Sequence, residues 1–250
     1  MEKPAARVQD SIATVVIIGH KSLMQTMSSE MLAYAKPVIL VGASPVPIDR
    51  ALANLPNDWP LIAADGGAST VLELGRVPEA IIGDMDSLSS AVNIPDGVST
   101  LHLRGQDDTD FEKCLARIDA PLIVGLGFLE ARLDHSLAAI HTLMRLPHDR
   151  PVLLVGTTDI LLRVQGNFAA SMPAGTRLSV WPLGYQPFHA STGLRWPLDG
   201  LAMAPGQLIG TSNEVTDPDI SITAATGDGY AVITPLEMLP RMLQAVIEEG

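Results

Sequence analysis

Short apolar runs alternate with segments of helical periodicity from Pro37 to about residue 150, and few folds accommodate that order. Short apolar runs bounded by turn residues predict strands, and the periodic segments between them predict helices. The predicted strands are 38–41, 61–64, 80–82, 100–103 and 122–124, and the predicted helices are 48–55, 69–74, 110–118 and 135–144. In the last helix, Leu137, Ile140 and Met144 have the spacing of an inward face. The alternation predicts a doubly wound, mostly parallel sheet, in which ligands bind beyond the carboxyl ends of the strands.

The pattern changes after Pro151, where short apolar runs are separated by Gly, Pro, Asn and Asp. Runs at 152–155, 160–164, 177–180, 207–209 and 230–233 predict a small antiparallel β-sandwich or barrel, followed by a helix at 236–248. The chain is therefore expected to divide into an N-terminal extension (1–36), an α/β domain (37–150) and a β-rich domain (151–250). Within the extension, the pattern predicts a strand at 14–18 and a Met-rich helix ending near Tyr34.

Two aspartates, Asp84 and Asp86, closely follow the apolar run 80–82. Residues two apart in a strand point the same way, so the two carboxylates can converge at the end of the strand. Ionised carboxylates that lie so close repel each other, and a cation or a shared proton relieves the repulsion. Oxygen ligands without His or Cys nearby suit Mg²⁺ before zinc. A polar turn after a buried strand is the alternative reading of this motif alone.

A second acidic cluster precedes the predicted helix 110–118. Thr109 and Glu112 have the spacing of a capping box, and Asp110 lies in the first turn, where the helix dipole favours an anion. Capping leaves the polar residues 106–108 unexplained. Two acidic clusters, each at an element boundary, indicate two halves of one metal site.

Composition limits the function classes. With 47% hydrophobic residues, the 250-residue chain can form a core, and its net charge of −12 argues against nucleic acid or an anionic membrane as a partner. The single cysteine, Cys114, cannot form an intrachain disulfide and is expected to pack in the core. No apolar run approaches the roughly 18 residues of a membrane span. The apolar run 12–19 could mimic the hydrophobic region of a secretory signal peptide, but acids precede it. A strand is therefore expected there, in a cytoplasmic protein.

Six motifs stand in a fixed order along the chain. They are ADGGA at 64–68, IIGDMDS at 81–87, QDDTDF at 106–111, RLDH at 132–135, TGLRWPL at 192–198 and TSNE at 211–214. In this order they resemble the thiamine pyrophosphokinases, and the resemblance extends from about residue 37 to residue 232. Six ordered motifs are far more specific than any one of them.

The resemblance implies an enzyme that transfers pyrophosphate from ATP to the hydroxyl of thiamine, giving thiamine diphosphate and AMP. It implies catalytic Mg²⁺ held by four acids, namely Asp84, Asp86, Asp107 and Asp110. The ATP contacts that it implies are Asp65, Gly66, Gln106, Thr109, Gly127, Arg132, Asp134 and His135. The thiamine contacts that it implies are Trp196, Ser212 and Asn213, in the β-rich domain. Capping roles for Asp65 and Asp134 and a core role for Trp196 are the alternatives.

The resemblance also implies a homodimer, with the site between domains or between subunits. One departure from the family pattern lies before Arg132, where the family carries two glycines and this chain has Glu130 and Ala131. Glu130 is expected to face the triphosphate and to weaken ATP binding through its charge. Two further functions are considered: a catalytically weak thiamine or nucleotide binding module, and a magnesium-dependent phosphohydrolase. A hydrolase would have no need of the motifs at 192–198 and 211–214.

Overall fold

A computed structural model describes residues 31–86, 93–103, 108–145 and 151–248. The strand predicted at 14–18 and most of the predicted Met-rich helix lie outside the described residues. The predicted end of that helix is wrong, because Leu32–Ala33 forms strand β1. Strand β1 pairs in parallel with β6 (Ile118–Asp119). This pairing also explains why the helix predicted at 110–118 ends at Leu115, since Ile118 is held in a strand.

Six parallel strands form one half of a ten-stranded sheet, in the order β8-β7-β2-β3-β4-β5. Their bounds are β2 (Val38–Val41), β3 (Leu61–Ala64), β4 (Ala80–Gly83), β5 (Ser99–His102), β7 (Ile123–Leu126) and β8 (Val152–Val155). Five of the six are buried along their whole length, as expected for strands that are covered on both faces. The five strands predicted before residue 150 are confirmed, although the run 152–155 was expected in the antiparallel half and here extends the parallel one.

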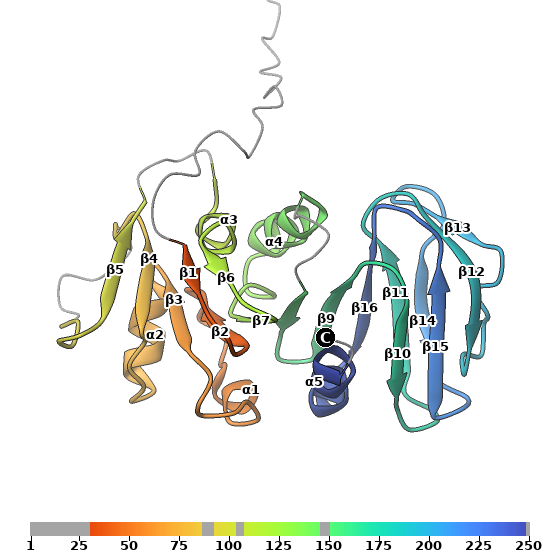
Figure 1. Ribbon diagram of the computed structural model, residues 1–250, viewed down its shortest axis with the longest axis horizontal. Helices are drawn as coiled ribbons and strands as arrows, with labels where there is room; N and C mark the ends of the chain where they lie inside the picture. The colour runs from red at the N-terminus through yellow and green to blue at the C-terminus, as the bar shows by residue number, and fades with distance from the viewer. Residues whose placement is uncertain (1–30, 87–92, 104–107, 146–150, 249–250) are drawn as a thin grey trace, which may run out of the picture. The chain divides into compact units, whose positions relative to one another are not determined.

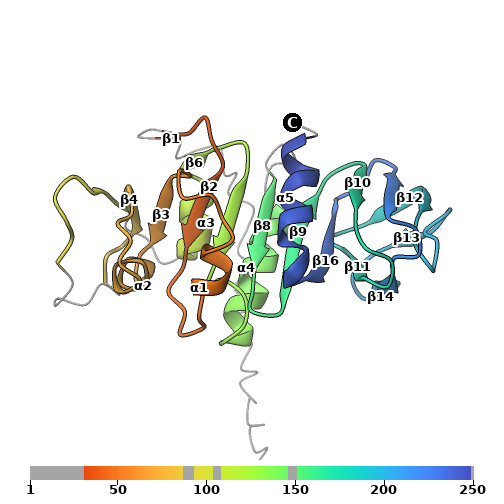
Figure 2. The same cartoon turned by 90° about the horizontal axis from the view of Figure 1, so that it is seen from below.

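Helices cover both faces of this sheet, so the doubly wound prediction is confirmed. Helices α1 (Asp49–Leu52), α2 (Gly67–Glu73) and α5 (Leu239–Glu248, preceded by the 3₁₀ turn η2, Leu236–Met238) contribute to a core on one face. Helices α3 (Asp110–Leu115) and α4 (Leu133–Arg145) contribute to a second core on the opposite face. Figure 1 shows α3 and α4 above the strands with α1 and α5 below, and Figure 2 shows the face with α1 and α5.

The inward face predicted for α4 is correct for Ile140, which is half-buried and packs against the core of that face, but wrong for Leu137 and Met144. The side chains of Leu137 and Met144 are 57% and 42% exposed, whereas Ala139, Thr142 and Leu143 are buried. The helix carries apolar residues on more than one face, so hydrophobicity alone does not choose between them. The buried hydroxyl of Thr142 has a hydrogen-bond partner, because it donates to the carbonyl of Ala138 (3.0 Å).

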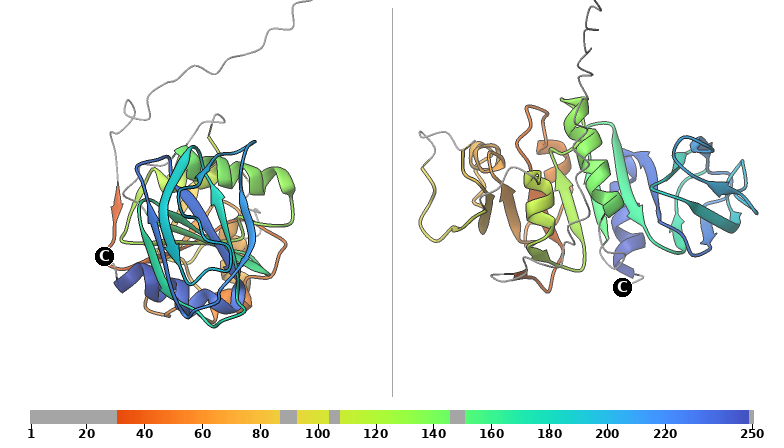
Figure 3. Two further views of the ribbon diagram at one scale, coloured as in Figure 1. Left: turned by 90° about the vertical axis from the view of Figure 1, so that its right-hand side faces the viewer. Right: turned by 90° about the horizontal axis from the view of Figure 1, so that it is seen from above.

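The second half of the chain forms a β-sandwich, as predicted. Its strands are β9 (Asp159–Val164), β10 (Phe168–Ser171), β11 (Arg177–Pro182), β12 (Gln186–Thr192), β13 (Ala202–Met203), β14 (Gly210–Glu214), β15 (Asp219–Ala224) and β16 (Tyr230–Pro235). One layer is the four-stranded sheet β10-β15-β12-β13, and the other is the antiparallel end β14-β11-β16-β9 of the ten-stranded sheet. Phe188 and Ile222 from the first layer pack with Val180 and Val232 from the second. Figure 3, left, views the molecule from the side on which the sandwich lies.

The strand predicted at 207–209 is wrong, because the strand begins at Gly210. Residues 204–208 form a turn in which the amide of Ala204 donates to the carbonyl of Leu208 (3.2 Å). Leu208 and Ile209 are exposed rather than packed in the sandwich. Pro205 and Gly206 favour the turn, and a short apolar run beside such a pair does not reveal whether it pairs.

One hydrogen-bonded sheet runs through both halves, because β8 pairs in parallel with β7 and antiparallel with β9. The predicted boundary at residue 150 therefore divides the chain but not the sheet. Strand order reverses between β2 and β7, which makes the carboxyl ends of these two strands the switch point where doubly wound proteins bind ligands. Within the described residues, no helix has the length and apolar character to cross a membrane.

Candidate active site

Three aspartates meet at the carboxyl ends of β3 and β4. Asp65 follows β3, and Asp84 and Asp86 follow β4, its parallel neighbour. The backbone amide of Asp65 continues the pairing by donating to the carbonyl of Ile82 (2.9 Å). Each of the three acids offers one carboxylate oxygen, and these oxygens lie within 4.8 Å of one another. The structure therefore adds Asp65 to the predicted acidic pair.

Asp65 is the unusual member of this cluster. It is only 2% exposed, and neither carboxylate oxygen has a hydrogen-bond partner within the described residues. Its backbone has a φ of +44°, a conformation that side chains other than glycine seldom adopt. Gly83 makes room for it, since a Cβ at position 83 would lie 2.7 Å from the Cβ of Asp65. A buried carboxylate without partners beside two further acids fits a bound cation.

Lys113 links this cluster to the second acidic stretch. Its Nζ atom lies 3.2 Å from Oδ2 of Asp84 and 3.0 Å from Oδ1 of Asp110, and its side chain is 9% exposed. Lys113 was not among the sequence candidates. Its position three residues after Asp110, directly after the acidic stretch, is the signal that points to it, since residues three apart share one face of a helix.

The charges of these groups are mutually dependent. Asp84 accepts hydrogen bonds from Lys113 and from Asp86, and these bonds, that of Lys113 first, hold the pKa of Asp84 below its ordinary value. Burial raises the pKa of Asp110, although Lys113 acts against that effect. Burial alone would lower the pKa of Lys113, but its hydrogen bonds to Asp110 and Asp84 outweigh burial and raise it. Lys113 is therefore a fixed positive charge at neutral pH, between acids that it partly neutralises.

The remaining candidates of the second stretch have mixed outcomes. Thr109 caps α3, because its hydroxyl accepts the amide of Glu112 (3.2 Å), as the capping interpretation requires. Glu112 pairs with Arg145 of α4 (2.9 Å). Gln106 and Asp107 lie outside the described residues. Cys114 is buried in the core of this face, as predicted.

Other candidates lie along the same edge. Gly127 follows β7 with a φ of +79°, and a Cβ there would stand 2.8 Å from the carbonyl oxygen of Gly42, after β2. The two glycines thus form a close backbone approach at the switch point. Arg132 and Asp134 pair with each other (Nη2–Oδ2 2.5 Å and Nε–Oδ1 3.1 Å), and both side chains are largely exposed. His135 is exposed in the first turn of α4, and Gly66 precedes α2.

The expectation that Glu130 faces bound phosphates is wrong. Its carboxylate accepts the backbone amides of Thr157 and Thr158, and the hydroxyl of Thr157, in the turn between β8 and β9. Backbone and hydroxyl donors that lie 27 and 28 residues later in the chain fix the direction of this side chain. The sequence around Glu130 contains no pattern that predicts a contact over such a separation.

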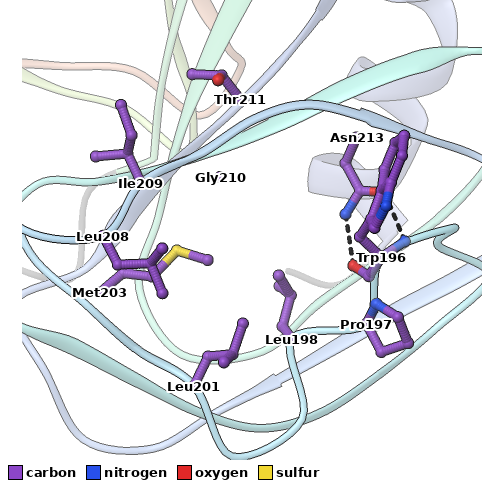
Figure 4. Close-up of a pocket in the computed structure, with 10 residues that line it drawn as sticks. All are labelled: Trp196, Pro197, Leu198, Leu201, Met203, Leu208, Ile209, Gly210, Thr211 and Asn213. Carbon is purple, nitrogen blue, oxygen red and sulfur yellow. Dashed lines mark hydrogen bonds between the residues drawn. The ribbon is translucent and has the colours of Figure 1, made fainter.

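The β-sandwich carries a separate pocket of about 200 Å³. Figure 4 shows its lining around an open space, namely Trp196, Pro197, Leu198, Leu201, Met203, Leu208, Ile209, Gly210, Thr211 and Asn213. The lining is mostly apolar, and Trp196 presents a side chain that is 55% exposed. An apolar pocket with one exposed ring and a few polar groups suits a flat heterocycle.

Asn213 holds the backbone of Trp196 in place. Its Oδ1 accepts the amide of Trp196 (3.1 Å), and its Nδ2 donates to the carbonyl of Trp196 (2.6 Å), as Figure 4 shows. The guanidinium of Arg195 lies 5.1 Å from the centre of the indole ring. Ser212 is exposed with a φ of +58°, and its amide donates to the hydroxyl of Ser179 (3.0 Å).

Comparison with known proteins gives two matching family models. "Thiamin pyrophosphokinase, catalytic domain" matches residues 51–154, and "Thiamin pyrophosphokinase, vitamin B1 binding domain" matches residues 168–227. Thiamine pyrophosphokinase 1 of Oryza sativa subsp. japonica is 30% identical over 198 residues, which cover 65% of this chain and 74% of that protein. The chain belongs to the thiamine pyrophosphokinase family.

Other members of the family agree. Thiamin pyrophosphokinase 1 of Caenorhabditis elegans is 26% identical over 211 residues, covering 77% of this chain and 86% of that protein. The solved structure of the Geobacillus thermodenitrificans thiamin pyrophosphokinase shares the fold with a TM-score of 0.66 and 24% identity, over 80% of this chain and 97% of that one. The Bacillus subtilis thiamine pyrophosphokinase structure has a TM-score of 0.65 and 18% identity, over 80% of this chain and 98% of that one. The acidic cluster lies within the catalytic-domain match, and Trp196 lies within the vitamin B1 match.

Proposed function

We propose that the acidic cluster at the ends of β3 and β4 holds Mg²⁺ for the reaction that family membership assigns to this chain. That reaction is transfer of pyrophosphate from ATP to the hydroxyl of thiamine, giving thiamine diphosphate and AMP. The hydroxyl oxygen bonds to the β-phosphorus and releases its proton to water, the bond from the β-phosphorus to the oxygen bridging the α-phosphate breaks, and AMP leaves with that oxygen. The observation that carries the metal assignment is the burial of Asp65 beside Asp84 and Asp86, with no hydrogen-bond partner for either carboxylate oxygen among the described residues.

The donor set fits Mg²⁺ rather than a softer ion. Asp65, Asp84 and Asp86 offer only carboxylate oxygens, which magnesium prefers. Asp110 is linked to these acids because Lys113 pairs with both Asp110 and Asp84. Asp107 is assigned to the same site from the sequence alone. When bound, the metal would neutralise charge on the phosphates and orient them.

The residues of the chain have separate tasks in this reaction. Phosphoryl transfer needs positioning and charge neutralisation more than covalent participation of the protein. Lys113 supplies a fixed cation among the acids, so the cluster repels an incoming triphosphate less than bare carboxylates would. Arg132 suits a phosphate because its planar fork can bond two oxygens, and Gly127 and Gly42 allow close approach of the backbone at the switch point. ATP is therefore assigned to the carboxyl edge of the parallel half.

Thiamine is assigned to the pocket of the sandwich. Trp196 offers an exposed ring on which a heterocycle can stack, and the apolar lining surrounds it. Asn213 acts by holding Trp196, because its amide oxygen and nitrogen already bond the backbone of that residue. This assigns Asn213 a supporting task in place of direct reading of the vitamin.

The distance between the two parts supports a homodimer. The pocket borders β14, the acids follow β3 and β4, and seven strands lie between β14 and β4 in the sheet. At about 4.8 Å per strand the two are roughly 38 Å apart along the sheet. The thiamine hydroxyl must come within about 3–3.5 Å of the phosphorus that it attacks, and a two-ring vitamin cannot bridge such a gap. A two-fold dimer that brings the pocket of one chain to the acids of its partner would complete two equal sites.

Among the alternatives, a magnesium-dependent phosphohydrolase would use the same acids but leaves the pocket around Trp196 without a task. A catalytically weak binding module would keep both parts without turnover. A cytoplasmic location is supported by Cys114, the single cysteine, which is buried as a free thiol.

The test is product analysis. Incubation of the protein with ATP, Mg²⁺ and thiamine should give AMP and thiamine diphosphate in equal amounts. Formation of ADP with thiamine monophosphate, or release of phosphate without thiamine, would overturn the proposal. Asp84→Asn serves as the matched control, since it keeps the size of the side chain and removes one of the charges that hold the metal.

A further inference from the structure

The loop between β7 and α4 holds two adjacent residues in a conformation that glycine usually supplies. Glu130 and Ala131 have φ values of +68° and +56°. For residues with a Cβ this left-handed region is unfavourable, and it persists only where the surroundings hold the chain there. The loop is the one that leads into Arg132, so whatever holds it also sets the position of that residue.

The carboxylate of Glu130 is what ties this loop down. Its two oxygens each lie 3.0 Å from the amide nitrogen of Thr157, one also accepts the hydroxyl of Thr157, and the other lies 3.3 Å from the amide of Thr158. Hydrogen bonds to an ionised carboxylate are stronger than those between neutral groups. On the other side of the loop, Ser136 bonds the carbonyl of Arg132 through its amide (3.1 Å) and its hydroxyl (3.2 Å).

The turn that receives Glu130 is itself anchored. It is closed by the amide of Gly156 donating to the carbonyl of Asp159 (2.9 Å), and the carbonyl of Thr158 accepts the amide of Leu236 (2.9 Å). Gly156 leaves the space that the carboxylate occupies, because a Cβ there would lie 2.7 Å from Oε1 of Glu130. The carboxylate, the glycine and the turn therefore fit together as one contact.

We propose that Glu130 is a positioning residue that fixes the loop 127–132 against the β8–β9 turn and thereby holds Arg132 where ATP binds. The inference rests on the proposed function for the role of Arg132. Glycines at positions 130 and 131 would permit the same backbone without fixing it, whereas here one carboxylate selects the conformation. Such preorganisation strengthens binding because less freedom is lost when the ligand arrives.

The experiment uses two readouts that need no turnover. The first is hydrogen–deuterium exchange at the amides of Thr157 and Thr158, and the second is titration with Mg²⁺ and α,β-methylene-ATP, which keeps the triphosphate but cannot be cleaved at the bond that breaks. Glu130→Gln keeps the length of the side chain but removes its charge. The Glu130→Gln variant should exchange these amides about tenfold faster, which corresponds to the loss of one charge-assisted hydrogen bond. The same substitution should also weaken binding of α,β-methylene-ATP about three- to tenfold.

Two further variants separate the effect of the contact with the β8–β9 turn from other effects of changing the Glu130 side chain. Gly156→Ala should displace the carboxylate without changing Glu130 and should reproduce both effects. Ala131→Gly relieves a left-handed residue but keeps the carboxylate, so exchange at Thr157 should stay as in the parent chain. In turnover assays, Glu130→Gln should raise KM for ATP while KM for thiamine changes less than about twofold.

The outcomes distinguish the two proposals. Unchanged exchange at Thr157 in Glu130→Gln would overturn the contact, and faster exchange with unchanged affinity for the analogue would overturn the positioning role. If the parent chain binds the analogue but forms no thiamine diphosphate, the proposed function fails, while exchange and titration still decide the task of Glu130.

Discussion

The Nζ atom of Lys113 lies 3.2 Å from Oδ2 of Asp84, so a buried cation stands beside the acids proposed to hold Mg²⁺. The two residues are 29 positions apart and come from α3 and the end of β4. Lys113 also reaches Asp110, so one ammonium group joins the two acidic stretches of the sequence. The cluster is therefore an ion-pair network as well as a candidate metal site, and the two roles can be tested separately.

Replacement of Lys113 by methionine should destabilise the protein at neutral pH by about 1 kcal/mol, because Asp110 loses its charged partner. The pKa of Lys113 is raised above its ordinary 10.5 in the folded chain. A raised pKa stabilises the fold below the ordinary value, and the contribution disappears as pH rises through the folded value. Urea unfolding of the parent and of Lys113→Met should therefore differ at pH 7 and converge in strong alkali. Lys36→Met, which breaks an exposed pair with Asp58, should change stability little at either pH.

Asp65→Asn should make the metal-free protein more stable and abolish its response to magnesium. The substitution keeps the shape of the side chain and removes a buried carboxylate that has no hydrogen-bond partner within the described residues. An unsatisfied buried polar group costs roughly 1–3 kcal/mol, and a charged one costs more. Thermal unfolding with and without Mg²⁺ measures both effects. The exposed Asp96→Asn should leave both unchanged. A variant at position 65 that loses stability yet keeps its magnesium response would exclude Asp65 from the metal site.

Two inactive variants should restore each other if the site is shared between subunits. Asp84→Asn impairs the metal site, and Trp196→Ala impairs the vitamin pocket. Mixed dimers would contain one site with both parts intact, so random exchange of subunits should recover about a quarter of the sites. Turnover after unfolding and refolding the two variants together measures this recovery. Activity no higher than that of the separately refolded variants would rule out the shared site.

Asn213→Asp should raise KM for thiamine and leave KM for ATP unchanged. The second carboxylate oxygen would replace the Nδ2 atom that donates to the carbonyl of Trp196, so two acceptors would face each other and the loop carrying the indole would move. The loss of stability should be about 1–3 kcal/mol. Asn167→Asp makes the same chemical change in the same sandwich but keeps an acceptor for the amide of Ala224, so it should alter neither constant. Equal changes in both KM values would indicate general unfolding.

The parts predictable from sequence are those that depend on neighbours in the chain. The apolar runs before residue 150 and the cap at Thr109 are local, and they are confirmed. Asp65 joins Asp84 only because β3 and β4 are adjacent in the sheet, and sequence order does not state adjacency. The direction of Glu130 depends on Thr157, in a turn that periodicity does not describe. The face of α4 was misassigned because Leu137 and Leu143 are equally apolar, and only packing against the sheet buries one of them.

The unbroken pairing from β5 to β14 has a mechanical consequence. Enzymes that enclose their substrates by rotating one domain over another need a flexible joint between the two. Here the six parallel strands and one layer of the β-sandwich (β9, β16, β11 and β14) belong to a single ladder, and bending it at β8 would break backbone hydrogen bonds on both sides. Water must therefore be excluded by loops at the carboxyl edge or by the approach of a second subunit. The radius of gyration of the assembled protein should accordingly stay the same when both substrates bind.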